Sequence, residues 1–226
     1  MSERPWRVAV IDSGLAAGMA PRPIRERRFM DEGLRIAELD PIDDPNGHGS
    51  VITGIIASSP RPIELLIAQV LDRQGRTTAA SVAAAVDWAG RQGAQLLHLS
   101  LGLPEDRRVL RGSIEEAISA GTAVVASSPA RGAMVYPAAY RGVIRATGDA
   151  RCAVDEISCL ETEQAHFGGC PVSGAGAGVS RGASIGAAHV SRFIVAHVEP
   201  GSPWHVVRET LKRRAAFHGR ERHSSV

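Results

Sequence analysis

The sequence predicts an α/β protein with a largely parallel central sheet. Short runs of β-branched and aliphatic residues recur along the chain, and segments with helical patterns lie between them. Strands that are apolar throughout are buried on both faces, and their alternation with helices is typical of a parallel sheet. No internal repeat or linker divides the 226 residues. We therefore expect a single compact domain over residues 1–226, with a disordered tail from about residue 217.

The central strands are expected wherever such an apolar run is bounded by turn residues. In chain order the expected strands are residues 7–11, 63–70, 94–100, 123–127 and 143–147. Two stretches, residues 16–44 and 152–179, show no regular strand or helix pattern. We expect the first of these to be a surface loop with room for a short strand.

Capping signals mark the starts of three further helices. Serine, threonine and proline are favoured there because they satisfy or avoid the free amide groups of the first turn. The expected helices are residues 79–91, capped by Thr77 or Thr78; residues 114–120, opened by a capping box of Ser113 and Glu116; and residues 204–216, opened by Ser202 and Pro203.

Composition excludes several classes of function. The net charge is +2, from 26 basic and 24 acidic residues, which is too balanced to predict nucleic acid or a membrane as a partner. No apolar run is long enough to cross a bilayer, and the polar start of the chain does not have the pattern of a secretory signal. The three cysteines, an odd number, suit a reducing compartment. We therefore expect a cytoplasmic protein.

Three segments join a reactive side chain to small residues at the end of a predicted strand or helix. Residues 8–14 form an apolar run that ends in Asp12, His48 precedes an apolar helical face, and Ser184 opens a helix of small and apolar residues. Each segment alone has an ordinary structural explanation, as a turn, a structural histidine or a helix cap. Their order along the chain is more informative, because Asp, His and Ser follow one another as in the subtilisin triad.

At these three points the sequence resembles the subtilase family of serine peptidases. The matching segments are residues 8–14 for the aspartate motif, residues 48–57 for the histidine motif and residues 182–190 for the serine motif. The resemblance covers about residues 6–198. It implies a subtilisin-like three-layer fold, with a mostly parallel central sheet and helices on both faces. Secreted members carry a pro-domain, but only a few residues precede the first expected strand here, so we expect none.

The chemistry of a serine nucleophile assigns a role to each of these residues. A serine hydroxyl needs a base to remove its proton, so Ser184 requires His48. His48 requires a carboxylate that fixes its tautomer, and Asp12 is expected to supply it. Asp43 and Asp44 are alternatives because they lie close to His48 in sequence, but their Pro- and Gly-rich setting predicts an exposed loop. We therefore favour Asp12.

The resemblance also implies residues that bind substrate. Ser100, Leu101 and Gly102 resemble the family's segment that pairs with the substrate backbone, and Ser128 lies in the run that borders the same site. The family normally completes its oxyanion hole with an asparagine after this run, but Ala130 stands near that position. We expect Ser128 or its neighbour Ser127 to offer a hydroxyl there.

The predicted function is that of a serine endopeptidase with narrow specificity, which removes a leader peptide from a partner protein or a modified peptide. The expected partner is a peptide or protein substrate, such as a small enzyme subunit with a leader. The alternative is a weakly active or inactive subtilase fold that acts as a peptide-binding maturation chaperone, because the oxyanion asparagine is missing.

We predict neither a cofactor nor a metal. The cysteines form no Cys-x-x-Cys pair, and His98 and His189 are expected to be core histidines. The glycine-rich run 173–178 could cradle a phosphate, but it lacks the lysine and the strand-to-helix setting of a phosphate-binding loop.

Overall fold

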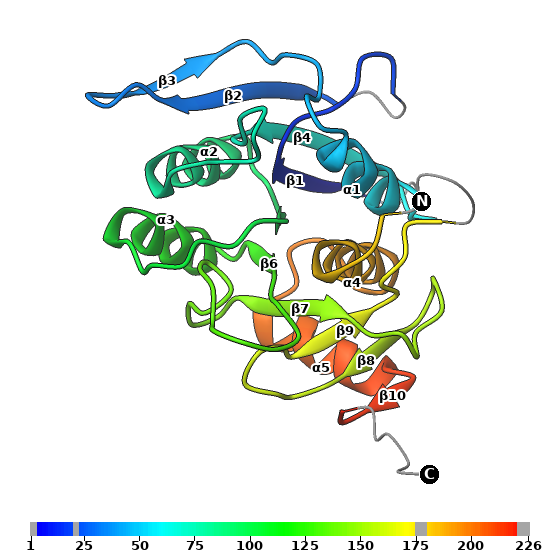
Figure 1. Ribbon diagram of the computed structural model, residues 1–226. Helices are drawn as coiled ribbons and strands as arrows, with labels where there is room; N and C mark the ends of the chain where they lie inside the picture. The colour runs from blue at the N-terminus through cyan, green and yellow to red at the C-terminus, as the bar shows by residue number, and fades with distance from the viewer. Residues whose placement is uncertain (1–3, 20–22, 175–179, 221–226) are drawn as a thin grey trace.

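The computed structural model describes residues 4–19, 23–174 and 180–220 (Figure 1). Within them the strands are β1 (Trp6–Asp12), β2 (Arg25–Asp31), β3 (Ile36–Leu39), β4 (Ile63–Gln69), β5 (Leu96–Leu99), β6 (Ala123–Ser127), β7 (Ile144–Gly148), β8 (Ile157–Cys159), β9 (Phe167–Gly169) and β10 (Phe217–His218). The helices are α1 (His48–Ala57), α2 (Ala79–Arg91), α3 (Arg108–Ser119), α4 (Ala183–His197) and α5 (Trp204–Arg214).

All described strands lie in one sheet, in the order β10-β8-β9-β7-β6-β5-β1-β4-β2-β3. The pairs β2–β3 and β8–β9 are antiparallel, and the other described pairs are parallel. Helices α2 and α3 cover one face of the sheet, and α1 and α4 cover the other (Figure 1). The predicted α/β fold with three layers is confirmed.

Strand β1 shows why the central runs are apolar at every position. Val8 and Val10 pack in the core on the side of α1 and α4, whereas Ala9 and Ile11 pack in the core on the side of α2 and α3. All four side chains are buried, because a strand alternates its side chains between the two faces and here both faces are covered by helices.

Helix α2 begins and ends as the sequence predicts. Thr78 is its N-cap, and the Thr78 side chain accepts a hydrogen bond of 3.1 Å from the Ser81 amide. We expect Thr78→Ala to lower the free energy of unfolding by about 1 kcal/mol, since the amide loses its partner. Thr77→Ala is the matched control, because the Thr77 hydroxyl is exposed and caps no amide of the helix. Urea unfolding of both variants tests this, and equal stability would contradict the capping role.

Helix α3 differs from the prediction. It begins at Arg108, six residues before the predicted start, so Ser113 lies inside the helix and is buried. The predicted capping box is therefore wrong. Leu110, Ile114 and Ala117 recur at helical spacing and all face the core, and this apolar stripe extends the helix past the capping signal. In α5, Pro203 is the N-cap rather than the first helical residue.

Two segments expected to be irregular contain strands that lie toward the two ends of the sheet. The surface loop predicted over residues 16–44 includes the hairpin of β2 and β3, of which β2 pairs with β4. Phe29 anchors this hairpin, because it is buried and its ring lies 5.9 Å from that of Trp88. Apart from Phe29 and Met30, the residues of β2 are charged, which hides the strand in the sequence. Residues 152–179 likewise contain β8 and β9.

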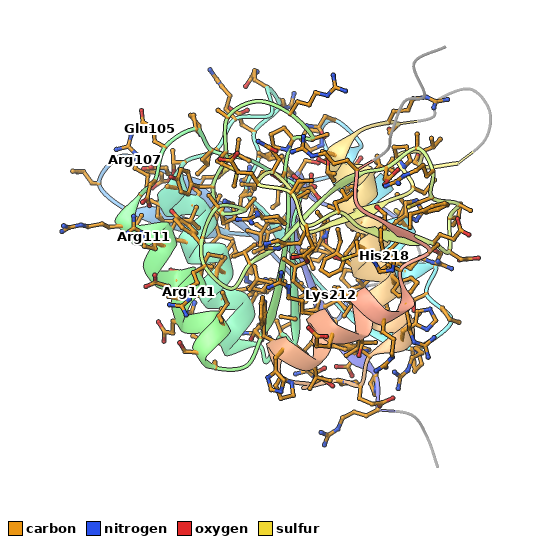
Figure 2. The ribbon with its side chains drawn as sticks, turned by 90° about the horizontal axis from the view of Figure 1, so that it is seen from below. Glu105, Arg107, Arg111, Arg141, Lys212 and His218 are labelled. Carbon is orange, nitrogen blue, oxygen red and sulfur yellow. The ribbon has the colours of Figure 1, made fainter. Side chains whose placement is uncertain are left out.

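The end of the chain is ordered further than predicted. Phe217 and His218 form β10, which pairs with Ser158 and Cys159 of β8. The tail expected to be disordered from about residue 217 therefore begins with a short strand. Residues 221–226 lie outside the described residues. Figure 2 shows Lys212 of α5 and His218 of β10 on the same side of the molecule.

Helix α5 packs through one face and pairs its charges through another. Val207 and Leu211 are buried, while Arg208 and Lys212 approach Glu161 at 2.7 and 3.8 Å. Part of the basic character of this helix is thus paired within the protein. No helix among the described residues is long and apolar enough to cross a lipid bilayer.

Candidate active site

The site forms at the edge of the sheet where the parallel strands end. Asp12 is the last residue of β1, a strand that lies between β4 and β5, and Asp12 is 1% exposed. His48 is the first residue of α1, and its Nδ1 lies 2.8 Å and 3.0 Å from the two carboxylate oxygens of Asp12. An ionised carboxylate can only accept, so Nδ1 carries the proton and donates it to Asp12. Nε2 is then left free to accept a proton.

The approach of α1 to the end of β1 depends on Gly49. A Cβ at this position would overlap the Gly14 carbonyl, and it would lie 3.2 Å from Ser13 Oγ. The Gly49 amide donates a hydrogen bond of 2.9 Å to Ser13 Oγ. The small residue beside His48 therefore lets the first turn of α1 rest on the turn that follows Asp12.

Asp44 organises the loop in front of α1 and does not contact the imidazole. Its carboxylate accepts hydrogen bonds from Ser13 Oγ at 2.8 Å, from Ser50 N at 2.8 Å and from Ser50 Oγ at 2.6 Å. Asp43 accepts from the Ala17 amide at 2.7 Å. The structure therefore brings Asp12, and not either alternative, into contact with His48.

Electrostatics favour the protonated form of His48 more than in a free histidine. The hydrogen bond from His48 to Asp12 raises the pKa of His48, burial opposes this, and the negative charges of Asp12 and Asp44 raise the pKa further. Burial also acts on Asp44, but its bonds from Ser50 and Ser13 hold the pKa of Asp44 below its usual value. The site can therefore stabilise an imidazolium that forms during a reaction.

Ser184 occupies the second position of α4, at the amino end of the helix. Gly182, just before the helix, has φ +131°, a conformation that side chains rarely adopt. The Ser184 hydroxyl donates a hydrogen bond of 3.3 Å to the Ser100 carbonyl. Among the described residues its recorded partner is this carbonyl and not the His48 imidazole. Because α1 and α4 pack side by side (Figure 1), a rotation about the Cα–Cβ bond can redirect the hydroxyl.

The predicted substrate segment continues from β5 beside this serine. Ser100 and Leu101 are each 7% exposed, whereas Gly102 is exposed. A Cβ at Gly102 would lie 2.8 Å from the Cγ2 of Val135, so Val135 packs directly against the backbone of the segment. The Leu103 amide donates to the Tyr136 carbonyl at 2.7 Å, which ties the segment to the neighbouring loop.

Ser127 and Ser128 are buried at the end of β6. Ser127 ends β6, and the amide of Ser128 donates to the Ala146 carbonyl at 2.8 Å. Ser128 is 1% exposed, and its hydroxyl finds no partner among the described residues. Ala130 lies beyond the strand and has no polar side chain. A replacement for the family's asparagine thus stays a prediction.

His98 was predicted only as a core residue, and the structure shows that it also contacts two serine side chains. It is fully buried, and its two ring nitrogens contact the hydroxyls of Ser100 and Ser191. The signal in the sequence was the spacing of two residues between His98 and Ser100, which places both side chains on one face of a strand. His189 is also buried, and its Nε2 lies 3.2 Å from the Val172 carbonyl.

The three cysteines, Cys152, Cys159 and Cys170, are buried and unpaired, so none of them is presented as a nucleophile among the described residues. Burial raises the pKa of Cys152 to about 12, so its thiol stays protonated. The run 173–178, considered above as a phosphate cradle, lies partly outside the described residues, because 175–179 are not described.

A buried aspartate that holds a histidine, and a serine at the start of a neighbouring helix, define the subtilisin-like class of α/β proteins. The profile of the Peptidase_S8 subtilase family matches residues 6–225. The chain belongs to the subtilase family.

Individual relatives match over parts of their length. The chain is 37% identical over 108 residues to subtilisin BL of Lederbergia lenta, a match that covers 43% of this chain and 40% of that protein. It is 32% identical over 149 residues to a thermostable alkaline protease of Halalkalibacterium halodurans, covering 61% of this chain and 40% of the relative. It is 26% identical over 154 residues to subtilisin DY of Bacillus licheniformis, covering 61% and 54%. The matches thus span about half or less of each relative.

Proposed function

We propose that the protein is a serine endopeptidase that uses Asp12, His48 and Ser184 as its catalytic triad. The observation that carries this proposal is the contact of 2.8 Å between His48 Nδ1 and the buried Asp12 carboxylate, with the start of α4 beside it. A binding protein has no chemical need of such a pair. The same three residues hold the order of the family's triad along the chain.

In this mechanism Asp12 holds the Nδ1–H of His48, so that Nε2 takes the proton from Ser184 Oγ as the oxygen attacks the scissile carbonyl. The imidazolium that forms is stabilised by the Asp12 carboxylate. The negative oxygen of the tetrahedral intermediate develops near the amino end of α4, whose free amides and dipole favour negative charge. His48 then gives the proton to the leaving amine, and water releases the acyl group by the same steps.

The proposed substrate is a leader peptide on one partner protein or modified peptide. Narrow specificity is supported by Val135, which packs directly against the backbone of the substrate segment at Gly102. The proposed role resembles that of another subtilase, the maturation protease of the γ subunit of quinohemoprotein amine dehydrogenase. We place this activity in the cytoplasm, which suits the three unpaired cysteines.

A second candidate function is that of a peptide-binding maturation chaperone with weak or no activity. It is favoured by the hydrogen bond of Ser184 to the Ser100 carbonyl and by the apolar residue Ala130. Catalytic hydrogen bonds are often loose in the absence of substrate, so the first of these does not decide against an enzyme.

Reaction with a fluorophosphonate distinguishes the two functions, because the probe needs an activated serine and no knowledge of the native substrate. We expect an adduct on Ser184, mapped by mass spectrometry, that forms in the wild type and is absent in Ser184→Ala. His48→Ala should slow the reaction by at least about a thousand-fold, since the proton of Ser184 loses its acceptor. A folded wild type that forms no adduct would overturn the proposed peptidase in favour of the binding function.

A further inference from the structure

A buried histidine connects two elements of the candidate site. His98 lies on β5, and its Nδ1 is 2.8 Å from Ser191 Oγ on α4. Its Nε2 is 2.6 Å from Ser100 Oγ, just beyond the end of the same strand. His98 and Ser191 are fully buried, so water does not compete for these hydrogen bonds. The three side chains form a Ser–His–Ser chain of hydrogen bonds beneath the site.

The imidazole of His98 is neutral. Burial and, as the smaller cause, the nearby charge of His48 together lower the pKa of His98 to about 3. A neutral imidazole has one N–H donor and one nitrogen acceptor, so the two serine hydroxyls must bond to it in different ways. One hydroxyl donates to the ring, and the other accepts from it.

The burial of Ser191 fixes which nitrogen carries the proton. The Ser191 hydroxyl has His98 as its recorded partner among the described residues, and a buried O–H that finds no acceptor is costly. Ser191 therefore donates to Nδ1, and the Nε2–H of His98 donates to Ser100 Oγ. This is the Nε2–H tautomer, in which His98 holds Ser100 by its side chain.

Ser100 carries the connection to the nucleophile. Its carbonyl accepts the hydrogen bond of 3.3 Å from Ser184 Oγ, so one residue is held by His98 through its side chain and touches Ser184 through its backbone. Ser184 and Ser191 both belong to α4, and His98 therefore also fixes this helix relative to β5.

We propose that His98, as the Nε2–H tautomer, is a positioning residue that fixes Ser100 and thereby the resting position of Ser184 Oγ beside the Ser100 carbonyl, from which the hydroxyl turns to His48. The inference rests on the proposed peptidase function, since it assigns a residue that supports the nucleophile. His98 acts without contacting the substrate. Because its ring is neutral, it sets geometry rather than charge, and its loss should leave the pKa of His48 unchanged.

Three substitutions separate positioning from simple packing. In His98→Gln the amide nitrogen reaches about as far as Nε2 and can donate to Ser100. In His98→Asn the shorter amide reaches only as far as Nδ1 and can bond Ser191 alone. His98→Leu fills similar space and bonds neither serine. Labelling is measured at increasing fluorophosphonate concentrations, which separates the maximal labelling rate from the binding constant of the probe. The rate is expressed per reactive site, and the number of reactive sites is the final amount of adduct.

We expect His98→Gln to label within about three-fold of the wild-type rate, and His98→Asn and His98→Leu about ten-fold more slowly, with unchanged binding of the probe. The pH at half-maximal rate should stay the same in all variants. Ser100→Ala should slow labelling by a similar factor, and adding it to His98→Asn should cause little further loss. A purely structural role predicts instead that the variants lose reactive sites while each remaining site keeps the wild-type rate.

Nitrogen NMR of the wild-type imidazole tests the tautomer without any variant. A proton on Nε2 of His98 is expected, and a proton on Nδ1 would overturn the inference even if every variant failed to fold. Labelling of His98→Asn at the wild-type rate would overturn it as well, while the peptidase function stood. A folded wild type that does not react with the fluorophosphonate would overturn both the proposed function and this inference.

Discussion

Asp12→Asn should slow the reaction of Ser184 with a fluorophosphonate by about four orders of magnitude, the loss that removal of this carboxylate causes in known serine proteases. An asparagine fits the same space, and its oxygen can still accept the Ser13 amide that now lies 2.6 Å from the Asp12 carboxylate. Its NH₂ group, however, would donate to Nδ1 of His48. The imidazole would then carry its proton on Nε2, where it cannot accept the proton of Ser184.

The same variant should also shift the pH dependence. His48 works as a base only in its neutral form, so the labelling rate of the wild type should rise with pH and reach half its maximum above the usual histidine pKa of about 6.5. Asp12 is the main cause of the raised pKa of His48, and burial acts in the opposite direction. Without the Asp12 carboxylate, the pKa of His48 falls, and any residual rate should reach half its maximum at a lower pH.

Two neighbouring carboxylates provide controls for Asp12→Asn. Asp43→Asn should leave the rate and the pH profile unchanged, because Asp43 bonds only the Ala17 amide in the described structure. Asp44→Asn should lower the pKa of His48 by less than Asp12→Asn, since Asp44 acts on it through charge alone. A rate for Asp12→Asn within about ten-fold of the wild type would show that another group orients His48.

The parts of the fold that could be predicted from sequence are those where one pattern dominates. β1, β4 and β6 are apolar on both faces, and α2 combines a threonine cap with a small-residue face. The hairpin of β2 and β3 could not be predicted in this way, because most of its side chains are only partly buried and those of β2 are mostly charged. Its place is set by pairing with β4, which is a contact between distant parts of the chain.

The candidate site likewise contains residues that local motifs predict and contacts that they do not. Asp12, His48 and Ser184 lie in short local motifs, so their order alone indicates their roles. The contact of His98 with Ser191 joins residues 93 positions apart, and no local pattern marks Ser191 as a partner. The neutrality of His98 depends on burial, which only the folded chain establishes.

Gly186→Ala should be the most destabilising single-methyl change in α4, with a loss of about 3 kcal/mol in the free energy of unfolding. A Cβ at Gly186 would overlap the Thr147 carbonyl and would lie 2.5 and 2.6 Å from the Cα and N of Gly148. These are backbone atoms of β7, so no rotation of a side chain can relieve the overlap. The helix would have to move away from the sheet.

Gly112→Ala is the matched control for this change, because Gly112 lies within α3 and a Cβ there meets nothing within 4 Å. Alanine is a better helix former, so this variant should be more stable than the wild type by up to about 1 kcal/mol. Urea unfolding of both variants measures the difference. Because Gly186 is two residues from Ser184, movement of α4 should also slow labelling of Ser184 in the folded protein. Equal stability of the two variants would show that this close approach of Gly186 to β7 does not hold α4 against the sheet.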